Sequence, residues 1–176
     1  MTPIRLLILD VDGVMTDGSL PYEAAGNIEK PFYVQDGGAI RLWQRSGGLA
    51  AIVSGRTSPA VTTRARDLGV SHVHMAVLDK VPVFEALTKE MGVTDIETAF
   101  MGDDLLDLEP MRRCGYAIAP GNAVAAVKRA AKYVTRRMGG HGAVHEAIER
   151  LMRYNNWWSD AMKPWSVRAK AGASGG

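Results

Sequence analysis

Residues 6–18 of the chain read Leu6-Leu7-Ile8-Leu9-Asp10-Val11-Asp12-Gly13-Val14-Met15-Thr16-Asp17-Gly18. Apolar residues without alternation are typical of a strand buried on both faces, as in a parallel sheet. Asp10 and Asp12 follow where such a strand reaches solvent, which is the end at which open α/β sheets bind ligands. Two carboxylates this close repel each other unless a cation neutralises them, so the pattern predicts a divalent metal site.

The length, composition and charge of the chain limit the classes of protein to which it can belong. A chain of 176 residues, 47% hydrophobic and 23% charged, is typical of one globular domain. Its net charge of +2 is too small to indicate a nucleic-acid partner. The single cysteine, Cys114, excludes an intrachain disulfide and is compatible with a reducing cytosol. We find no secretory signal and no apolar run of the roughly 20 residues that span a bilayer, so we expect a cytoplasmic protein without membrane contact.

Strand-like and helix-like segments alternate along the chain. Strands are expected at 5–9, 49–53, 72–76, 98–101, 116–118 and 133–134, and helices at 36–46, 59–68, 80–91, 105–113, 124–131 and 144–152. Ser58 is the expected N-cap of the second helix, with Pro59 at its first position and Gly69 after its last turn. Alternation of this kind predicts a three-layer α/β domain of Rossmann-like type with a mainly parallel sheet.

One segment interrupts the alternation. Residues 18–34 carry apolar side chains on both sides of Ala25-Gly26-Asn27, which is typical of a β-hairpin turn. A projecting hairpin is marginally stable by itself, so we expect it to pack against a neighbouring subunit.

The C-terminal segment also differs from the rest. We divide the chain into a domain at 1–153, which includes the hairpin insertion, and a tail at 154–176. Trp157, Trp158 and Trp165 are too apolar for an inert tail, so we expect them to dock on the body or on a neighbouring subunit. The last few residues are expected to be disordered.

Polar clusters follow four successive predicted strands. They are Asp10 and Asp12; Ser54, Gly55 and Arg56; Lys80; and Asp103, Asp104 and Asp107. Because the carboxyl ends of parallel strands share one edge, these side chains are expected to meet in one cleft. Carboxylates, a hydroxyl, a lysine and an arginine together suit magnesium-dependent phosphoryl transfer, with a carboxylate nucleophile and a second carboxylate as general acid and base. The chain has no P-loop motif.

Each motif also has a purely structural explanation. Asp-x-Asp-Gly alone occurs in calcium-binding-like turns and surface loops, and Lys80 alone is typical of a solvated helix start. Ser54 could cap a helix, and Asp107 could merely favour a helix N-terminus. Arg41 and Arg64 could be solvated surface residues. The four histidines lack a compact zinc-like spacing.

Taken together, the motifs resemble those of the haloacid dehalogenase superfamily of phosphohydrolases. Asp10 to Thr16 matches its Asp-x-Asp-Gly-x-x-Thr/Val motif, and Gly102-Asp103-Asp104-Leu105-Leu106-Asp107 matches its acidic motif with a shorter spacing. The resemblance implies the following roles: Asp10 as nucleophile; Asp12 as general acid and base; Ser54 and Lys80 as catalytic residues; Mg²⁺ bound by the Asp10 side chain, the Asp12 backbone carbonyl and Asp103; and Asp104 and Asp107 orienting Lys80 or a metal-bound water.

A narrower resemblance covers roughly residues 5–146. Ser54-Gly55-Arg56-Thr57-Ser58 and Gly139-Gly140 through Val144 are similar to segments of the 3-deoxy-D-manno-octulosonate-8-phosphate phosphatases. That family has a β-hairpin in place of a cap domain and forms homotetramers in which an adjacent subunit completes each active site. The resemblance implies substrate contacts at Tyr33, Val34, Gln35, Asp36, Gly37, Arg41, Gly55, Arg56, Arg64 and Lys80. His145 stands where the family often has arginine.

The resemblance thus implies a magnesium-dependent phosphatase of lipopolysaccharide biosynthesis that hydrolyses 3-deoxy-D-manno-octulosonate 8-phosphate through an aspartyl-phosphate. Three alternatives stay open. The substrate could be a nine-carbon ketoacid 9-phosphate of sialic-acid type, or the domain could be a non-catalytic interaction scaffold. Haloalkanoic acid hydrolysis fits less well, because enzymes of that kind generally lack an acid at the position of Asp12.

Overall fold

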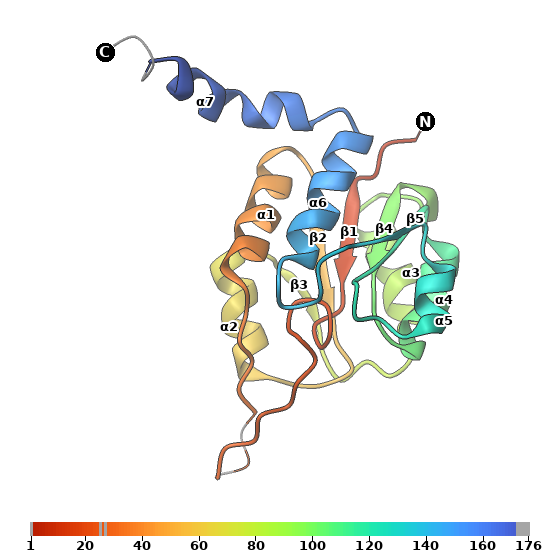
Figure 1. Ribbon diagram of the computed structural model, residues 1–176. Coiled ribbons are helices and arrows are strands. Elements are labelled where there is room, and N and C mark those ends of the chain that lie inside the picture. Colours follow the sequence, from red (N-terminus) through yellow and green to blue (C-terminus); the bar gives the residue numbers. More distant parts are fainter. Residues whose placement is uncertain (1, 25, 27, 172–176) are drawn as a thin grey trace.

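The computed structural model describes residues 2–24, 26 and 28–171, and shows one six-stranded sheet with helices on both faces (Figure 1). All the paired strands are parallel, in the order β3-β2-β1-β4-β5-β6. Their bounds are β1 Leu6–Leu9, β2 Leu49–Val53, β3 His72–His74, β4 Thr98–Met101, β5 Tyr116–Ala119 and β6 Tyr133–Val134. The predicted parallel α/β fold is confirmed.

Alternate residues of β1 point into two separate cores, as expected for a strand buried on both faces. Leu7 and Leu9 belong to the core beneath α1, α2 and α6, whereas Leu6 and Ile8 belong to the core beneath α3, α4 and α5. The helices are α1 Val34–Arg45, α2 Pro59–Leu68, α3 Val81–Glu90, α4 Leu108–Arg113, α5 Ala125–Ala130, α6 Ala143–Tyr154 and α7 Trp158–Ala171.

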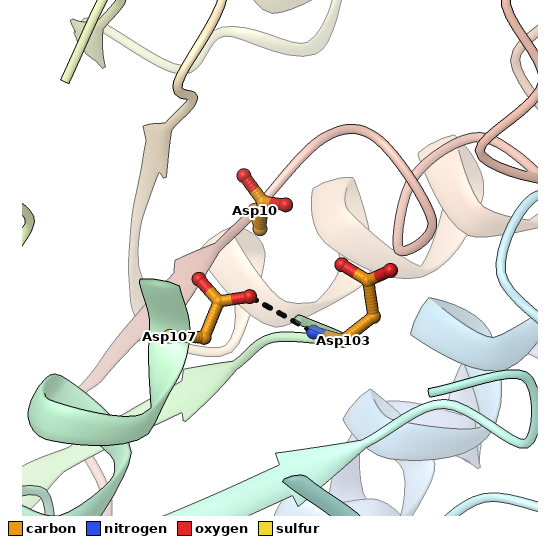
Figure 2. Close-up of side chains that lie close together, drawn as sticks. All are labelled: Asp10, Asp103 and Asp107. Atoms are coloured by element: carbon orange, nitrogen blue, oxygen red, sulfur yellow. Dashed lines mark hydrogen bonds between the residues drawn. The ribbon is translucent and has the colours of Figure 1, made fainter. Parts of the chain in front are cut away.

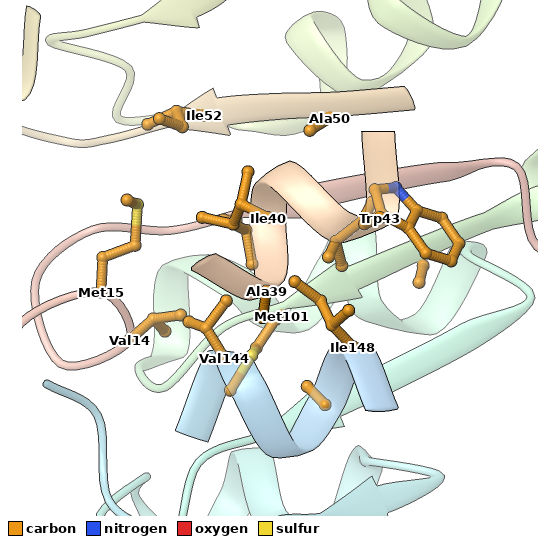
Figure 3. Packing of buried hydrophobic residues seen from close by; sticks show 14 of the residues in the cluster. Val14, Met15, Ala39, Ile40, Trp43, Ala50, Ile52, Met101, Val144 and Ile148 are labelled. Atoms are coloured by element: carbon orange, nitrogen blue, oxygen red, sulfur yellow. The ribbon is translucent and has the colours of Figure 1, made fainter. Parts of the chain in front are cut away.

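The larger core lies between the sheet, α1 and α6 (Figure 3). Ile40 of α1 points toward β2, and Val144 and Ile148 of α6 point toward α1. Trp43 is fully buried, and its indole N–H donates to the carbonyl of Leu49 at 2.8 Å. This packing ties α1 and α6 to the central strands, whose ends carry the polar clusters.

Two helices depart from the expected form. The segment 105–113 is a 3-10 turn at Leu105–Asp107 followed by α4, because the Asp107 carboxylate turns back to accept backbone N–H groups that precede the helix. In α2, Pro59 and the left-handed Gly69 (φ 72°) lie where predicted. Ser58 is the N-cap residue, as predicted, although no helix N–H donates to its hydroxyl.

The segment 19–33 projects from the body, and its described residues form no continuous pair of strands (Figure 1). Among its described residues, one isolated antiparallel bridge joins Tyr22 to Ile28. Pro21 and Pro31 have no backbone N–H to offer to a strand ladder, which limits pairing on both sides of the turn. Ala25 and Asn27, two residues of the predicted turn, lie outside the described residues.

The tail forms a helix that the sequence reading left out. α6 ends at Tyr154, and α7 follows it and extends away from the body (Figure 1). Trp157 packs on Trp43 of the same chain, with ring centroids 5.2 Å apart, and Trp158 also contacts the core. The expected disorder falls on residues 172–176, outside the described residues. None of the helices described is long and apolar enough to cross a bilayer.

Candidate active site

The predicted polar clusters meet at the carboxyl edge of the sheet. Asp10, Ser54 and Asp103 follow β1, β2 and β4, which are neighbours in the sheet, and Lys80 directly precedes α3. A pocket of about 470 Å³ opens there. Its polar side chains are Asp10, Asp12, Arg56, Lys80, Asp103, Asp104 and Asp107, and Gly55 also lines it. Parallel topology therefore gathers residues that lie far apart in the sequence.

Three carboxylates form the floor of this pocket (Figure 2). One oxygen from each of Asp10, Asp103 and Asp107 lies within 4.8 Å of the others. Asp107 is fully engaged by donors: its Oδ2 accepts the N–H groups of Asp103 at 3.0 Å and Asp104 at 3.1 Å, and its Oδ1 accepts from Lys80 at 2.6 Å. Asp107 thus orders the acidic loop and the lysine, whereas Asp10 and Asp103 are better placed as metal ligands.

Lys80 is a buried cation held between two acids. Its side chain is 2% exposed, and its Nζ lies 2.8 Å from Asp10 and 2.6 Å from Asp107. Burial lowers the pKa of Lys80, but the carboxylates of Asp10 and Asp107 outweigh that effect, so its pKa lies above the usual value. The lysine consequently stays charged where it can meet a phosphate oxygen.

The acids of the pocket carry more negative charge than the described side chains neutralise. Burial raises the pKa of Asp103 to about 8, and the negative charges of Asp10, Asp107 and Asp104 act in the same direction. Burial also raises the pKa of Asp10 to about 6, against the opposing effect of Lys80. Oδ1 of Asp103 is buried and has no hydrogen-bond partner among the described residues. A hard divalent cation with oxygen ligands fits this arrangement.

Glycines allow the loop after β1 to approach these acids. Gly13 has φ +84°, and a Cβ there would lie 2.0 Å from Oδ2 of Asp103. Gly139 packs behind the loop, where a Cβ would lie 1.8 Å from the Gly13 carbonyl oxygen. Asn122 links the two glycines, because its Nδ2 donates to the Gly13 carbonyl and its Oδ1 accepts from the Gly139 N–H. The sequence reading missed Asn122, which stands outside every motif it used.

Asp12 contacts two cations. Lys30 forms a hydrogen-bonded ion pair with its Oδ1, and Nε of Arg56 lies 3.9 Å from its Oδ2. Ser54 is buried nearby, and its hydroxyl oxygen accepts the Arg56 N–H at 3.3 Å. Lys30 was also missed from the sequence. Its spacing of two from Ile28 and from Phe32 was the available signal, since extended chain places such residues on one face.

Seven of the ten expected substrate contacts do not line this pocket in the single subunit. They are Tyr33, Val34, Gln35, Asp36, Gly37, Arg41 and Arg64, whereas Gly55, Arg56 and Lys80 do line it. Asp36 is 3% exposed, and its Oδ1 accepts the His145 N–H at the start of α6. Arg41 donates to the carbonyl of Asp67, and Arg64 to that of Tyr33. Within one chain these side chains tie elements together.

The fold and the site define a hydrolase of the haloacid dehalogenase-like class, and residues 69–148 match that family. Over 150 residues the chain is 38% identical to the 3-deoxy-D-manno-octulosonate 8-phosphate phosphatase KdsC of Haemophilus influenzae. The aligned residues cover 85% of this chain and 83% of the relative. The KdsC of Escherichia coli K12 is 38% identical over 149 residues, covering 85% and 79%.

Solved structures agree. The phosphatase from Moraxella catarrhalis, in complex with magnesium, phosphate and a KDO molecule, superposes with a TM-score of 0.89 at 36% identity, covering 92% of this chain and 93% of that one. The cobalt-bound enzyme of Haemophilus influenzae gives 0.86 at 37% identity, covering 90% and 92%. The chain belongs to the KdsC family of phosphatases within the haloacid dehalogenase-like hydrolases. The predicted family, phosphatase activity and magnesium cofactor are confirmed.

Proposed function

We propose that this phosphatase hydrolyses 3-deoxy-D-manno-octulosonate 8-phosphate to the free sugar acid and phosphate. The observation that carries the proposal is the buried Lys80 between Asp10 and Asp107, with Asp103 beside them at the strand ends. The relatives at 38% identity bear the name of this activity, and the Moraxella catarrhalis structure holds magnesium, phosphate and KDO. Arg56, which lines the pocket, adds positive charge that suits an anionic sugar acid.

In the proposed first step, a carboxylate oxygen of Asp10 bonds to phosphorus while the bond from phosphorus to the sugar oxygen breaks. Asp12 donates its proton to that leaving oxygen. Lys80 holds Asp10 in place and neutralises charge on the phosphate oxygens. In the second step Asp12 takes a proton from water, the water oxygen bonds to phosphorus, and the Asp10 carboxylate is released.

Asp10 and Asp103 would hold Mg²⁺ through their side chains, with the Asp12 carbonyl as a further ligand. When bound, the ion neutralises non-bridging phosphate oxygens and the carboxylates around it. Oδ1 of Asp103 is buried without a hydrogen-bond partner in the described part of the chain, which supports this assignment.

A substrate panel tests the proposal. Phosphate release is measured with and without Mg²⁺ on eight-carbon and nine-carbon ketoacid phosphates, and kcat/KM is compared across the panel. We expect the eight-carbon substrate to give the highest value, with activity lost when the metal is chelated. A higher value for the nine-carbon substrate would replace the proposed substrate, and the absence of any turnover would favour the scaffold alternative.

The nucleophile is tested by Asp10→Asn. We expect turnover to be abolished because an uncharged amide is too weak a nucleophile to form the acyl phosphate, while the far-UV circular dichroism stays unchanged. Full activity in a preparation free of wild-type enzyme would remove Asp10 from this role.

The homotetramer and the cytoplasmic location implied by the resemblance also stay proposals. The segment 19–33 projects from the body, and the expected substrate contacts on α1 and α2 lie outside the pocket of their own subunit. Both features are compatible with a site that an adjacent subunit completes.

A further inference from the structure

Lys30 is a second buried cation of the site, and it comes from outside every phosphatase motif. Its side chain is 2% exposed, although it belongs to the projecting segment 19–33. Its ammonium group contacts Oδ1 of Asp12. An ammonium group taken out of water is costly unless it is paired, so the contact with Asp12 compensates the burial of Lys30.

The two oxygens of Asp12 have different surroundings. Oδ1 is bound to the buried Lys30, whereas Nε of Arg56 lies 3.9 Å from Oδ2, beyond hydrogen-bond length. The Arg56 side chain is 53% exposed, so its charge is screened by water. The Asp12 side chain is 22% exposed and lines the acidic pocket. Oδ1 of Asp12 is therefore held by Lys30, and Oδ2 is available to pass a proton to a bound molecule.

We propose that Lys30 is a positioning residue that presents Oδ2 of Asp12 to the oxygen of the leaving group. The inference rests on the proposed function, in which Asp12 donates a proton to that oxygen. A carboxylate rotates about its side-chain bonds, and Lys30 restricts the rotation through Oδ1. As the bond between phosphorus and the sugar oxygen breaks, the proton passes from Oδ2 to that oxygen, and Lys30 itself gives up no proton.

The nature of the leaving group separates this role from a structural one. A sugar alkoxide is a poor leaving group and needs the proton, whereas 4-nitrophenolate leaves without one. Loss of proton donation should therefore slow the sugar phosphate much more than 4-nitrophenyl phosphate. A general loss of folded enzyme would lower both rates by the same factor.

The experiment measures kcat and KM of the magnesium-loaded enzyme on 3-deoxy-D-manno-octulosonate 8-phosphate and on 4-nitrophenyl phosphate. The variants are Lys30→Met, Lys30→Arg and Asp12→Asn. Lys89→Met is the matched control, because Lys89 is an exposed lysine in the last turn of α3. The ratio of the two kcat/KM values in one preparation is independent of the active fraction, so a partly folded variant still gives an answer.

We expect Lys30→Met to lower the ratio of kcat/KM for the sugar phosphate to kcat/KM for nitrophenyl phosphate about tenfold or more. The loss should be smaller than the roughly 10²–10⁴-fold in rate that loss of a general acid costs. Lys30→Arg should restore part of the ratio, and Lys89→Met should leave it unchanged. An equal loss on both substrates, or no loss, for Lys30→Met overturns the inference. If Asp12→Asn leaves the ratio unchanged, the assignment of Asp12 itself fails and the inference falls with it.

Discussion

At the scale of one residue, Asp103 shows how strongly burial changes the pKa of a carboxylate side chain. Burial and three neighbouring carboxylates raise its pKa to about 8, from an ordinary value of 3.8. Between these values the folded, metal-free protein binds a proton that the unfolded chain does not. Its stability should therefore fall as the pH rises through this range, and the raised pKa of Asp10 adds to the fall at the lower end.

Magnesium should counteract this fall, because it stabilises the charged carboxylates. We expect thermal unfolding to show a larger Mg²⁺-induced rise in Tm near pH 8.5 than near pH 6, where a proton competes for Asp103. Asp103→Asn is the control, and it should weaken both the pH dependence of the metal-free protein and the response to Mg²⁺. An equal metal response at both values would contradict the raised pKa of Asp103.

At the scale of elements, two glycines with different surroundings give a matched test of the packing. Gly38 is exposed within α1, and nothing lies within 4 Å of a Cβ placed there. Gly38→Ala should therefore raise the free energy of unfolding by about 0.5–1 kcal/mol through the lower entropy of the unfolded chain. Gly139→Ala would collide with the Gly13 backbone, so it should lower that free energy by roughly 1–3 kcal/mol.

Urea unfolding measures both glycine variants. Gly139→Ala should also weaken Mg²⁺ binding, because Gly13 lies against Asp103. A Gly139→Ala variant as stable as the wild type would show that the loop after β1 has room to move.

Elements with strong local signals were predicted well. The four central strands, β1, β2, β4 and β5, follow from short apolar runs, and α2 follows from Pro59 and Gly69 at its ends. Of the hairpin predicted at 18–34, the described residues keep one antiparallel bridge, because its few apolar residues do not outweigh the prolines on both sides of the turn. α7 was missed because Pro164 lies within it, although Trp158 and Trp165 are seven residues apart, a spacing of two helical turns.

At the scale of the whole molecule, the tail is tied to the body by aromatic packing. Trp157 packs on the buried Trp43, whereas Trp165 is 52% exposed. We expect Trp157→Ala to lower the free energy of unfolding by about 2–4 kcal/mol, toward the lower end because the residue is only partly buried. Trp165→Ala should change it by less than about 0.5 kcal/mol. Equal effects in denaturant unfolding would contradict this docking of the tail.

Assembly is the other property of the whole molecule that a measurement can test. Sedimentation velocity at working concentrations should give a species of four subunits, as the family resemblance implies. Substitutions in the projecting segment, such as Tyr22→Ser at an exposed tyrosine, should shift the distribution toward smaller species. A monomer under these conditions would contradict the tetramer, while the proposed chemistry of Asp10 and Lys80 would stand.

The amino-acid sequence by itself determined the class of fold, the order of the elements and the acidic site, because each follows from near neighbours or from motifs at strand ends. Only the tertiary structure decided the partners of side chains from distant segments. Lys30 meets Asp12, Asp36 turns toward the start of α6, and Trp157 covers Trp43. Such pairs depend on how loops and helices pack over the sheet, and local sequence patterns do not predict which distant segments come into contact.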